Sequence, residues 1–151
     1  MKYYTVEEVL RKMEYFCAYQ ERSHYQVERK LQEYGMIPEA RDYIILHLIN
    51  NNFLNEERFA RTYVRGKFYQ KKWGKKKITQ GLKYHRIQRQ LIHKALNEIS
   101  PEDYIKTIEL LVEKKQQQIK NTNAFNKRQK IIKYLLQKGY DYKEFSHILT
   151  E

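Results

Sequence analysis

One short pattern recurs three times along the chain at intervals of about fifty residues, and it restricts the possible folds more than any other feature. In each copy, a leucine is followed four residues later by a glycine or an arginine, and then at once by a large apolar residue. The three copies are Leu31, Gly35 and Met36; Leu82, Arg86 and Ile87; and Leu135, Gly139 and Tyr140. A recurrence of this length is typical of tandem helical units that stack side by side.

Apolar residues recur at helical spacing along the whole chain, and no stretch keeps the period of two that a strand requires. Several helix starts carry clear signals. Thr5 with Glu8, and Ser23 with Gln26, have the spacing of capping boxes, and Ser100 precedes a proline and two acids. The nine predicted helices begin at Thr5, Ser23, Pro38, Asn55, Lys75, Gln88, Ser100, Ile131 and Tyr142.

These helices fall into three groups of three, which predicts an all-α fold of three tandem three-helix repeats stacked into an elongated, curved array. The predicted repeats cover residues 1–54, 55–99 and 100–151. A single compact bundle of all nine helices is the alternative that the sequence leaves open.

The positive charge is concentrated in the middle of the chain. The 151 residues include 30 Lys+Arg and 18 Asp+Glu, a formal net charge of +12. Between Arg58 and Asn97 stand 13 basic residues and no acidic one, so this segment carries the whole excess. A solvated helix surface normally mixes both signs, because like charges repel. The asymmetry favours a surface for a polyanion or an acidic protein over charge that serves only solubility.

No signature of catalysis or metal binding accompanies this charge. The 5 glycines are scattered and form no phosphate-binding loop, and the 5 histidines show no i,i+4 pairing. The single cysteine, Cys17, lies on an apolar helix face and is interpreted as a core residue. We therefore expect no catalytic residue, no metal and no cofactor. Without an apolar run of membrane length, a cytoplasmic location is expected.

The predicted helix after Asn55 has a basic stripe and an opposite apolar face. The stripe holds Arg58, Arg61, Arg65 and Lys72 with Tyr69 beside them, and the apolar face holds Phe59, Ala60 and Tyr63. A dense basic segment, Lys71 to Lys77, follows around the only tryptophan. Trp73 has two interpretations that stay open: packing between helices, or stacking on a base or a cation.

Together these features predict a DNA- or filament-binding surface on the middle repeat, because arginine and lysine suit phosphates and carboxylates. The candidate residues are Arg58, Arg61, Arg65, Lys67, Lys71, Lys72, Trp73, Lys75, Lys76, Lys77, Lys83, Arg86 and Arg89.

The block Phe53 to Ala60, the segment Tyr63 to Arg65, and Trp73-Gly74 with Ile78 and Leu82 resemble the RecX family of recombination regulators. Ser23, Leu31 and Gly35 fit the first repeat of that family, and the resemblance extends from about Glu14 to near the end of the chain. The resemblance implies a small cytoplasmic protein, not an enzyme, that binds the RecA recombinase. It also implies a place in the groove of the RecA–DNA filament, where the protein limits filament extension, strand exchange, ATP hydrolysis and SOS-linked coprotease activity.

We therefore expect a monomeric negative modulator of the RecA filament that contacts single- or double-stranded DNA through its middle repeat. A free-standing nucleic-acid-binding helical repeat protein is the alternative. Two positions depart from the family pattern: Asn55 replaces an acid, and Arg86 replaces the glycine that closes the fifth helix. Asparagine caps a helix equally well, whereas arginine has to adopt positive φ or use another cap.

Overall fold

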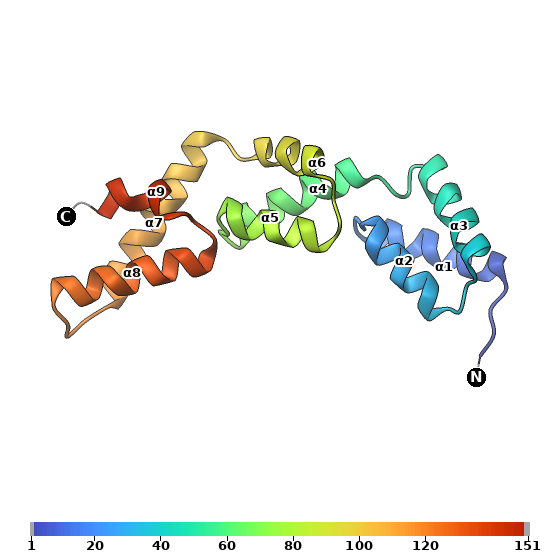
Figure 1. The fold of residues 1–151 in the computed structure, drawn as a ribbon, viewed down its shortest axis with the longest axis horizontal. Coiled ribbons are helices and arrows are strands. Elements are labelled where there is room, and N and C mark those ends of the chain that lie inside the picture. Colours follow the sequence, from blue (N-terminus) through green and yellow to red (C-terminus); the bar gives the residue numbers. More distant parts are fainter. Residues whose placement is uncertain (1, 150–151) are drawn as a thin grey trace.

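A computed structural model describes residues 2–149, which form an all-helical protein (Figure 1). The first group contains α1 (Val6–Tyr19), α2 (His24–Glu33) and α3 (Pro38–Asn50). The second contains α4 (Glu56–Arg65), the π-helical turn η1 (Gly66–Gln70), α5 (Lys75–Tyr84), α6 (Arg89–Ala95) and the 3-10 turn η2 (Leu96–Glu98). The third contains α7 (Pro101–Gln118), α8 (Ala124–Lys138), α9 (Tyr142–Phe145) and the 3-10 turn η3 (Ser146–Leu149).

No strand occurs among residues 2–149, so the predicted all-α class is confirmed. Within the same range, no helix has both the length and the apolar character needed to cross a membrane. Residue 1 and residues 150–151, the outer ends of the predicted first and third repeats, lie outside the described residues.

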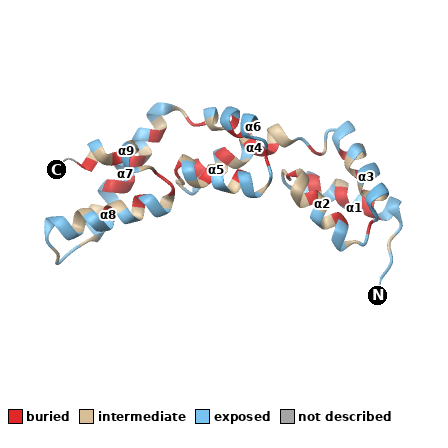
Figure 2. Cartoon of the chain, in the orientation of Figure 1, coloured by how far each residue is buried: buried red, intermediate tan, exposed pale blue. Residues whose placement is uncertain are grey.

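The three groups follow one another along an elongated, arched molecule, with the chain ends at opposite extremes (Figure 1). This arrangement confirms the stacked array of three-helix repeats and excludes the single compact bundle. Buried residues line the inner faces of the helices in each group, and exposed residues cover the outside (Figure 2).

The helix starts carry the capping bonds that the sequence predicts. At α1, Thr5 Oγ1 accepts a hydrogen bond from the Glu8 N–H at 3.1 Å, and Glu8 Oε1 accepts one from the Thr5 N–H at 2.8 Å. These reciprocal bonds satisfy two amide groups that have no partner within the helix. The other predicted side-chain caps that form are Ser23, Asn55 and Ser100.

The recurring pattern builds the same turn three times, after α2, α5 and α8. Gly35, Arg86 and Gly139 have φ of 75°, 60° and 104°. In each turn, the next N–H donates to the carbonyl of the pattern's leucine, over 3.0 to 3.1 Å. The three leucines, Leu31, Leu82 and Leu135, are fully buried. Arg86 therefore takes the left-handed conformation that a glycine adopts without strain, and the turn is unchanged.

Buried apolar side chains form two separate clusters among the described residues. One lies within the first group and extends from Val9 to Leu54. The other is shared by the second and third groups and extends from Phe59 to Leu149. The first group therefore has its own core, while the other two groups have one in common.

The second and third groups are joined through backbone atoms. The start of α5 meets the end of α8, where the Gly74 N–H donates to the Lys138 carbonyl at 2.8 Å and the Lys76 N–H to the Gly139 carbonyl at 3.1 Å. A Cβ on Gly74 would overlap the Gly139 backbone, and a Cβ on Gly139 would overlap Lys77. Glycine at both positions lets the positive end of one helix touch the negative end of the other.

The first and second groups meet through polar and aromatic side chains instead. Arg58 Nε donates to Glu21 Oε2 at 2.6 Å, and Ser23 Oγ lies 2.9 Å from His85 Nδ1. Burial, and then the charge of Lys67, lower the pKa of His85, which favours its neutral form in this joint.

Three predictions of element detail differ from the structure. The eighth helix begins at Ala124, ahead of the predicted Ile131, because Asn123 caps it. The sixth, predicted from Gln88 to Ile99, ends as α-helix at Ala95 and continues as a 3-10 turn to Glu98. The helical spacing of apolar residues predicts Ile44, Ile45, Leu48 and Ile49 as the core face of α3. Ile44 and Leu48 are buried, but Ile49 is exposed.

Candidate nucleic-acid interface

The cations of α4 and η1 lie on the side of these elements that is not buried in the shared core. Phe59, Ala60 and Val64 of α4 and Phe68 of η1 are buried in the shared core, and Tyr63 packs against it half-buried. The predicted apolar face is therefore confirmed. The π-helical turn η1 then carries the chain toward α5, and such turns frequently occur at functional sites.

Five lysines gather where η1, the start of α5 and the end of α8 meet. We call them the lysine cluster: Lys67, Lys71, Lys72, Lys77 and Lys138. Lys67 Nζ lies 4.8 Å from the centroid of the Trp73 ring, and Lys77 Nζ lies 4.4 Å from it. Trp73 also packs, partly buried, against the shared core. The tryptophan therefore holds two ammonium groups and contributes to helix packing at the same time.

The lysine cluster is electrostatically unsatisfied. Burial, and then the charges of Lys71 and Lys77, lower the pKa of Lys67. Burial, and then the charges of Lys77, Lys72 and Lys71, lower the pKa of Lys138. Within the described part of the chain, none of the five lysines forms a salt bridge with a carboxylate. A bound anion would relieve this repulsion, which is the property expected of a phosphate-binding surface.

Hydrogen bonds from two side chains to backbone carbonyls hold the cluster in place. Lys138 Nζ donates to the Lys71 carbonyl at 3.0 Å, and Tyr140 Oη donates to the Lys72 carbonyl at 2.8 Å. Lys72 itself has φ of 60°, the left-handed conformation that reverses the chain into α5. Strained backbone of this kind persists where the surrounding structure fixes it, and it is common at ligand sites.

Sequence reasoning missed Lys138, because it comes from the third repeat. In the sequence, Lys138 looks like any surface lysine, and no neighbouring residue indicates a binding role. The available signal is its position directly before Gly139, the turn glycine of the repeated pattern. Only the joint between Gly74 and α8 brings it beside residues more than sixty positions earlier.

The arginine stripe differs from the expected open row of guanidinium groups. Arg58 is half-buried, and besides Glu21 it donates to the side chain and carbonyl of Asn52, each at 3.0 Å. Arg65 donates to Glu98 at 2.8 Å. The partner acids, Glu21 and Glu98, lie outside residues 58–97, which contain no acidic residue. Their contact with the arginines depends on the fold and could not be predicted from the sequence.

The other predicted residues are spread around the middle group. Lys75 Nζ lies 4.7 Å from the Tyr104 ring, and Lys76 Nζ lies 3.9 Å from Asp141. Arg86 stacks on the Tyr25 ring at 4.7 Å. Among residues 2–149, Arg61, Lys83 and Arg89 form no salt bridge with an acid, and Lys83 and Arg89 are exposed. The structure thus brings together only part of the predicted set.

A cavity of about 410 Å³ adjoins the lysine cluster, between the first and second groups. Lys67 and Lys71 line one side, and Tyr63, His85 and Glu21 line others. The cationic surface is therefore hollowed where the two groups meet.

Metal-binding and nucleophilic chemistry find no support in the described residues. No three or more His, Cys, Asp or Glu side chains come together there in a way that could hold a metal. Cys17 is buried, and burial raises the pKa of its thiol to about 11, as its predicted core role requires.

These observations define an all-helical tandem-repeat protein whose middle repeat contributes four of the five members of a lysine cluster without a carboxylate partner in the described residues. The chain belongs to the RecX family, because the model of the second three-helix domain of RecX matches residues 55–96 and that of the third matches residues 102–149.

Known relatives agree with this assignment. The chain is 29% identical over 126 residues to the regulatory protein RecX of Lactobacillus johnsonii, covering 83% of this chain and 46% of that protein. It is 28% identical over 126 residues to the regulatory protein RecX of Vibrio parahaemolyticus, covering 83% of this chain and 79% of that protein. The matched region thus spans about half of the first relative's length.

Solved structures share the fold. The crystal structure of RecX from Lactobacillus salivarius has a TM-score of 0.85 and 25% identity, over 95% of this chain and 94% of that one. A second crystal structure, of a regulatory protein RecX, has a TM-score of 0.86 and 23% identity, over 97% of this chain and 72% of that one.

Proposed function

We propose that this protein is a negative modulator of the RecA recombinase that binds the RecA–DNA filament in its groove. The observation that carries the proposal is the lysine cluster, whose mutual repulsion a row of phosphates would neutralise. Membership of the RecX family supports the recombinase as the partner through the resemblance stated above. The protein acts by binding and catalyses no reaction.

The arched shape supports a groove as the site of binding (Figure 1). The cationic middle group faces the DNA phosphates, and the outer groups reach neighbouring recombinase subunits. A rigid body held in this way limits filament extension, and strand exchange and ATP hydrolysis fall as a result. The protein acts as a monomer in the cytoplasm, on filaments with single- or double-stranded DNA.

A free-standing nucleic-acid-binding protein is the second candidate, because the lysine cluster would bind phosphates without a recombinase. Such a protein binds through counterion release, so its affinity falls steeply with salt. A filament modulator keeps its protein–protein contacts when phosphate contacts are screened.

The test is a titration of RecA-dependent ATP hydrolysis at about 50 mM and about 200 mM salt, with binding to naked single-stranded DNA measured in parallel. We expect substoichiometric protein to suppress hydrolysis at the higher salt, where it scarcely binds naked DNA. Inhibition only where the protein already saturates the DNA would mean competition for DNA, and the modulator proposal would fail.

A further inference from the structure

The first group contains a second cationic cavity, which none of the predicted site residues touches. It has a volume of about 580 Å³ and lies against α1 and α2. We call it the N-terminal groove. Four of its lining residues are cations and four are aromatic, and no carboxylate lines it. The first 57 residues hold 7 basic and 10 acidic side chains, so this sign is a local arrangement and not the character of the segment.

Arg22 is the central cation of the groove. Its Nε donates to the Phe16 carbonyl at 2.9 Å, and its guanidinium carbon lies 3.7 Å from the centroid of the Phe16 ring. Burial lowers its pKa, and no carboxylate among residues 2–149 forms an ion pair with it. A partly desolvated arginine held in one orientation, with its terminal nitrogens uncommitted, is suited to a phosphate.

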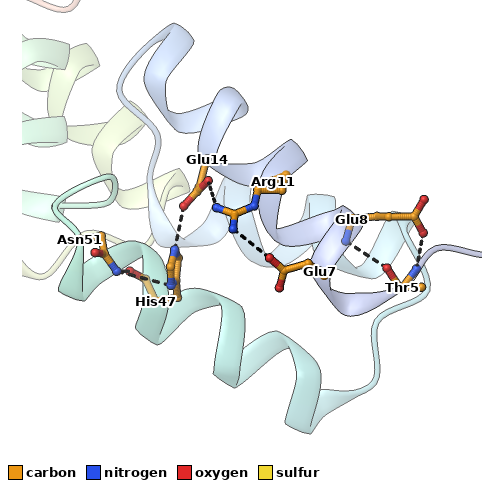
Figure 3. Close-up of polar contacts among 7 residues, drawn as sticks. All are labelled: Thr5, Glu7, Glu8, Arg11, Glu14, His47 and Asn51. Carbon is orange, nitrogen blue, oxygen red and sulfur yellow. Dashed lines mark hydrogen bonds and ion pairs between the residues drawn. The ribbon is translucent and has the colours of Figure 1, made fainter.

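The other arginine of the groove already has acidic partners. Arg11, which also lines the groove, is committed to Glu7 at 3.0 Å and Glu14 at 3.1 Å, and His47 shares Glu14 at 2.8 Å (Figure 3). Only Nε of Arg22 is committed, so its terminal nitrogens are open to a ligand. Lys12 lies beside it in the lining, and Lys30, also in the lining, lies 3.7 Å from Glu33.

Two of the four aromatic residues of the groove are more exposed than a core requires, whereas Phe16 and Tyr34 pack partly buried against the first core. Tyr15 is 74% exposed and Tyr19 is 72% exposed. Because they are four residues apart on α1, they lie on one face of the helix, one turn from each other. Exposed rings next to a cation without an acidic partner, here Arg22, are the usual elements of single-stranded nucleic-acid binding: bases stack on the rings and a phosphate meets the cation.

We propose that the N-terminal groove binds single-stranded DNA, with bases stacked on Tyr15 and Tyr19 and a phosphate on Arg22. An acidic peptide would satisfy the cations but would make no use of two exposed ring faces, so the observations favour the nucleic acid. This site goes beyond the recombinase proposal and does not depend on it, because it requires only DNA.

The experiment is a fluorescence-anisotropy titration of the full chain without recombinase. The probes are an oligothymidine of about fifteen nucleotides, a duplex of equal length and a polyglutamate peptide. The variants are Tyr19→Ala and Arg22→Gln. Matched controls from the same group are Tyr43→Ala, an exposed tyrosine on α3, and Arg29→Gln, an exposed arginine on α2. Neither control residue lines the groove.

We expect Tyr19→Ala to bind the single strand about five- to a hundredfold more weakly and the duplex as wild type does, because only unpaired bases can stack. Arg22→Gln lowers the dependence of log affinity on log salt by about 0.7 for the single strand. Both controls bind as wild type. Circular dichroism checks that each variant is folded. If Arg22→Gln is unfolded, the result for Tyr19→Ala decides whether the proposal holds.

Unchanged single-strand affinity in Tyr19→Ala would overturn the proposal. So would a loss of peptide binding without a loss of single-strand binding, since that would make the groove an acidic-peptide site. Replacing residues of the lysine cluster weakens the binding of single strand and duplex alike, whereas Tyr19→Ala weakens only the binding of the single strand. The two proposals can therefore fail independently, and the probe affinities show which one has failed.

Discussion

At the scale of the residue, the partner of a cation decides what the cation does. Arg58 and Lys67 are both half-buried residues of the basic middle segment, but Glu21 neutralises Arg58 while further lysines surround Lys67. Arg58 therefore joins the first group to the second, and Lys67 belongs to a surface that still lacks its counter-charge. The sequence predicted the basic segment, but it could not separate these roles because the neutralising acids lie outside it.

Arg58→Ala should lower the stability of the protein, whereas Lys71→Ala should lower its affinity for DNA. Loss of Arg58 removes charged hydrogen bonds to Glu21 and Asn52, so the free energy of unfolding should fall by about 2 kcal/mol. Exposed Lys71→Ala should change it by less than about 0.5 kcal/mol but should weaken DNA binding. Denaturant unfolding and a DNA titration measure both quantities. Equal stability losses would show that Arg58 is not part of the joint.

The thiol of Cys17 should be protected from alkylation. Because burial raises its pKa to about 11, the thiolate, which is the reactive form, is scarce at neutral pH. At pH 8 we expect iodoacetamide to react about a hundredfold more slowly with folded than with urea-denatured protein. The folded rate should rise about tenfold per pH unit up to pH 10. A folded rate equal to the denatured rate would contradict the buried position.

At the scale of the element, local signals predicted starts and turns better than joints. Thr5, Ser23 and Ser100 cap helices as expected, because a cap is a contact between residues three positions apart. The start of α8 was missed, because the polar stretch before it gave no apolar period. The joint between Gly74 and Gly139 depends on two positions far apart in the chain, and no local pattern encodes their contact.

Three glycine-to-alanine variants separate backbone strain from close approach. Gly35 has positive φ but open space around it, so Gly35→Ala should cost about 1 kcal/mol. Gly139 has positive φ and also touches Lys77, so Gly139→Ala should cost more than about 3 kcal/mol. Gly66 has neither constraint, and Gly66→Ala should be neutral or stabilising by up to about 1 kcal/mol.

Denaturant unfolding measures the three values. Equal losses of stability in Gly35→Ala and Gly139→Ala would show that the start of α5 and the end of α8 are not in close contact.

At the scale of the whole molecule, stability is divided between two cores. The recurring pattern predicted three repeats, and the fold has them. The boundaries at residues 54/55 and 99/100 stay a prediction, while the hydrophobic clusters divide the described chain into the first group and the other two together. Whether two repeats share one core depends on shape complementarity between them. The spacing of apolar residues does not reveal that complementarity.

Leu31→Ala and Leu135→Ala should therefore destabilise different parts of the chain. Each removes a fully buried side chain, at a cost of about 3 kcal/mol. In hydrogen-exchange mass spectrometry, Leu31→Ala should speed exchange in α1 to α3 only. Leu135→Ala should speed it in α4 to α9 and leave the first group unchanged. Faster exchange of α8 in Leu31→Ala would indicate a single cooperative core.

The central claim is that the lysine cluster binds the phosphates of the recombinase filament. The most direct test compares filament binding of Lys67→Gln/Lys71→Gln/Lys77→Gln with that of Lys120→Gln/Lys130→Gln/Lys133→Gln, which removes equal charge from exposed lysines of the third group. We predict that the first variant binds at least about tenfold more weakly than wild type and loses about two to three units of salt dependence. The second should bind within about twofold of wild type, because none of its three lysines belongs to the lysine cluster. Equal affinities of the two variants would contradict the account.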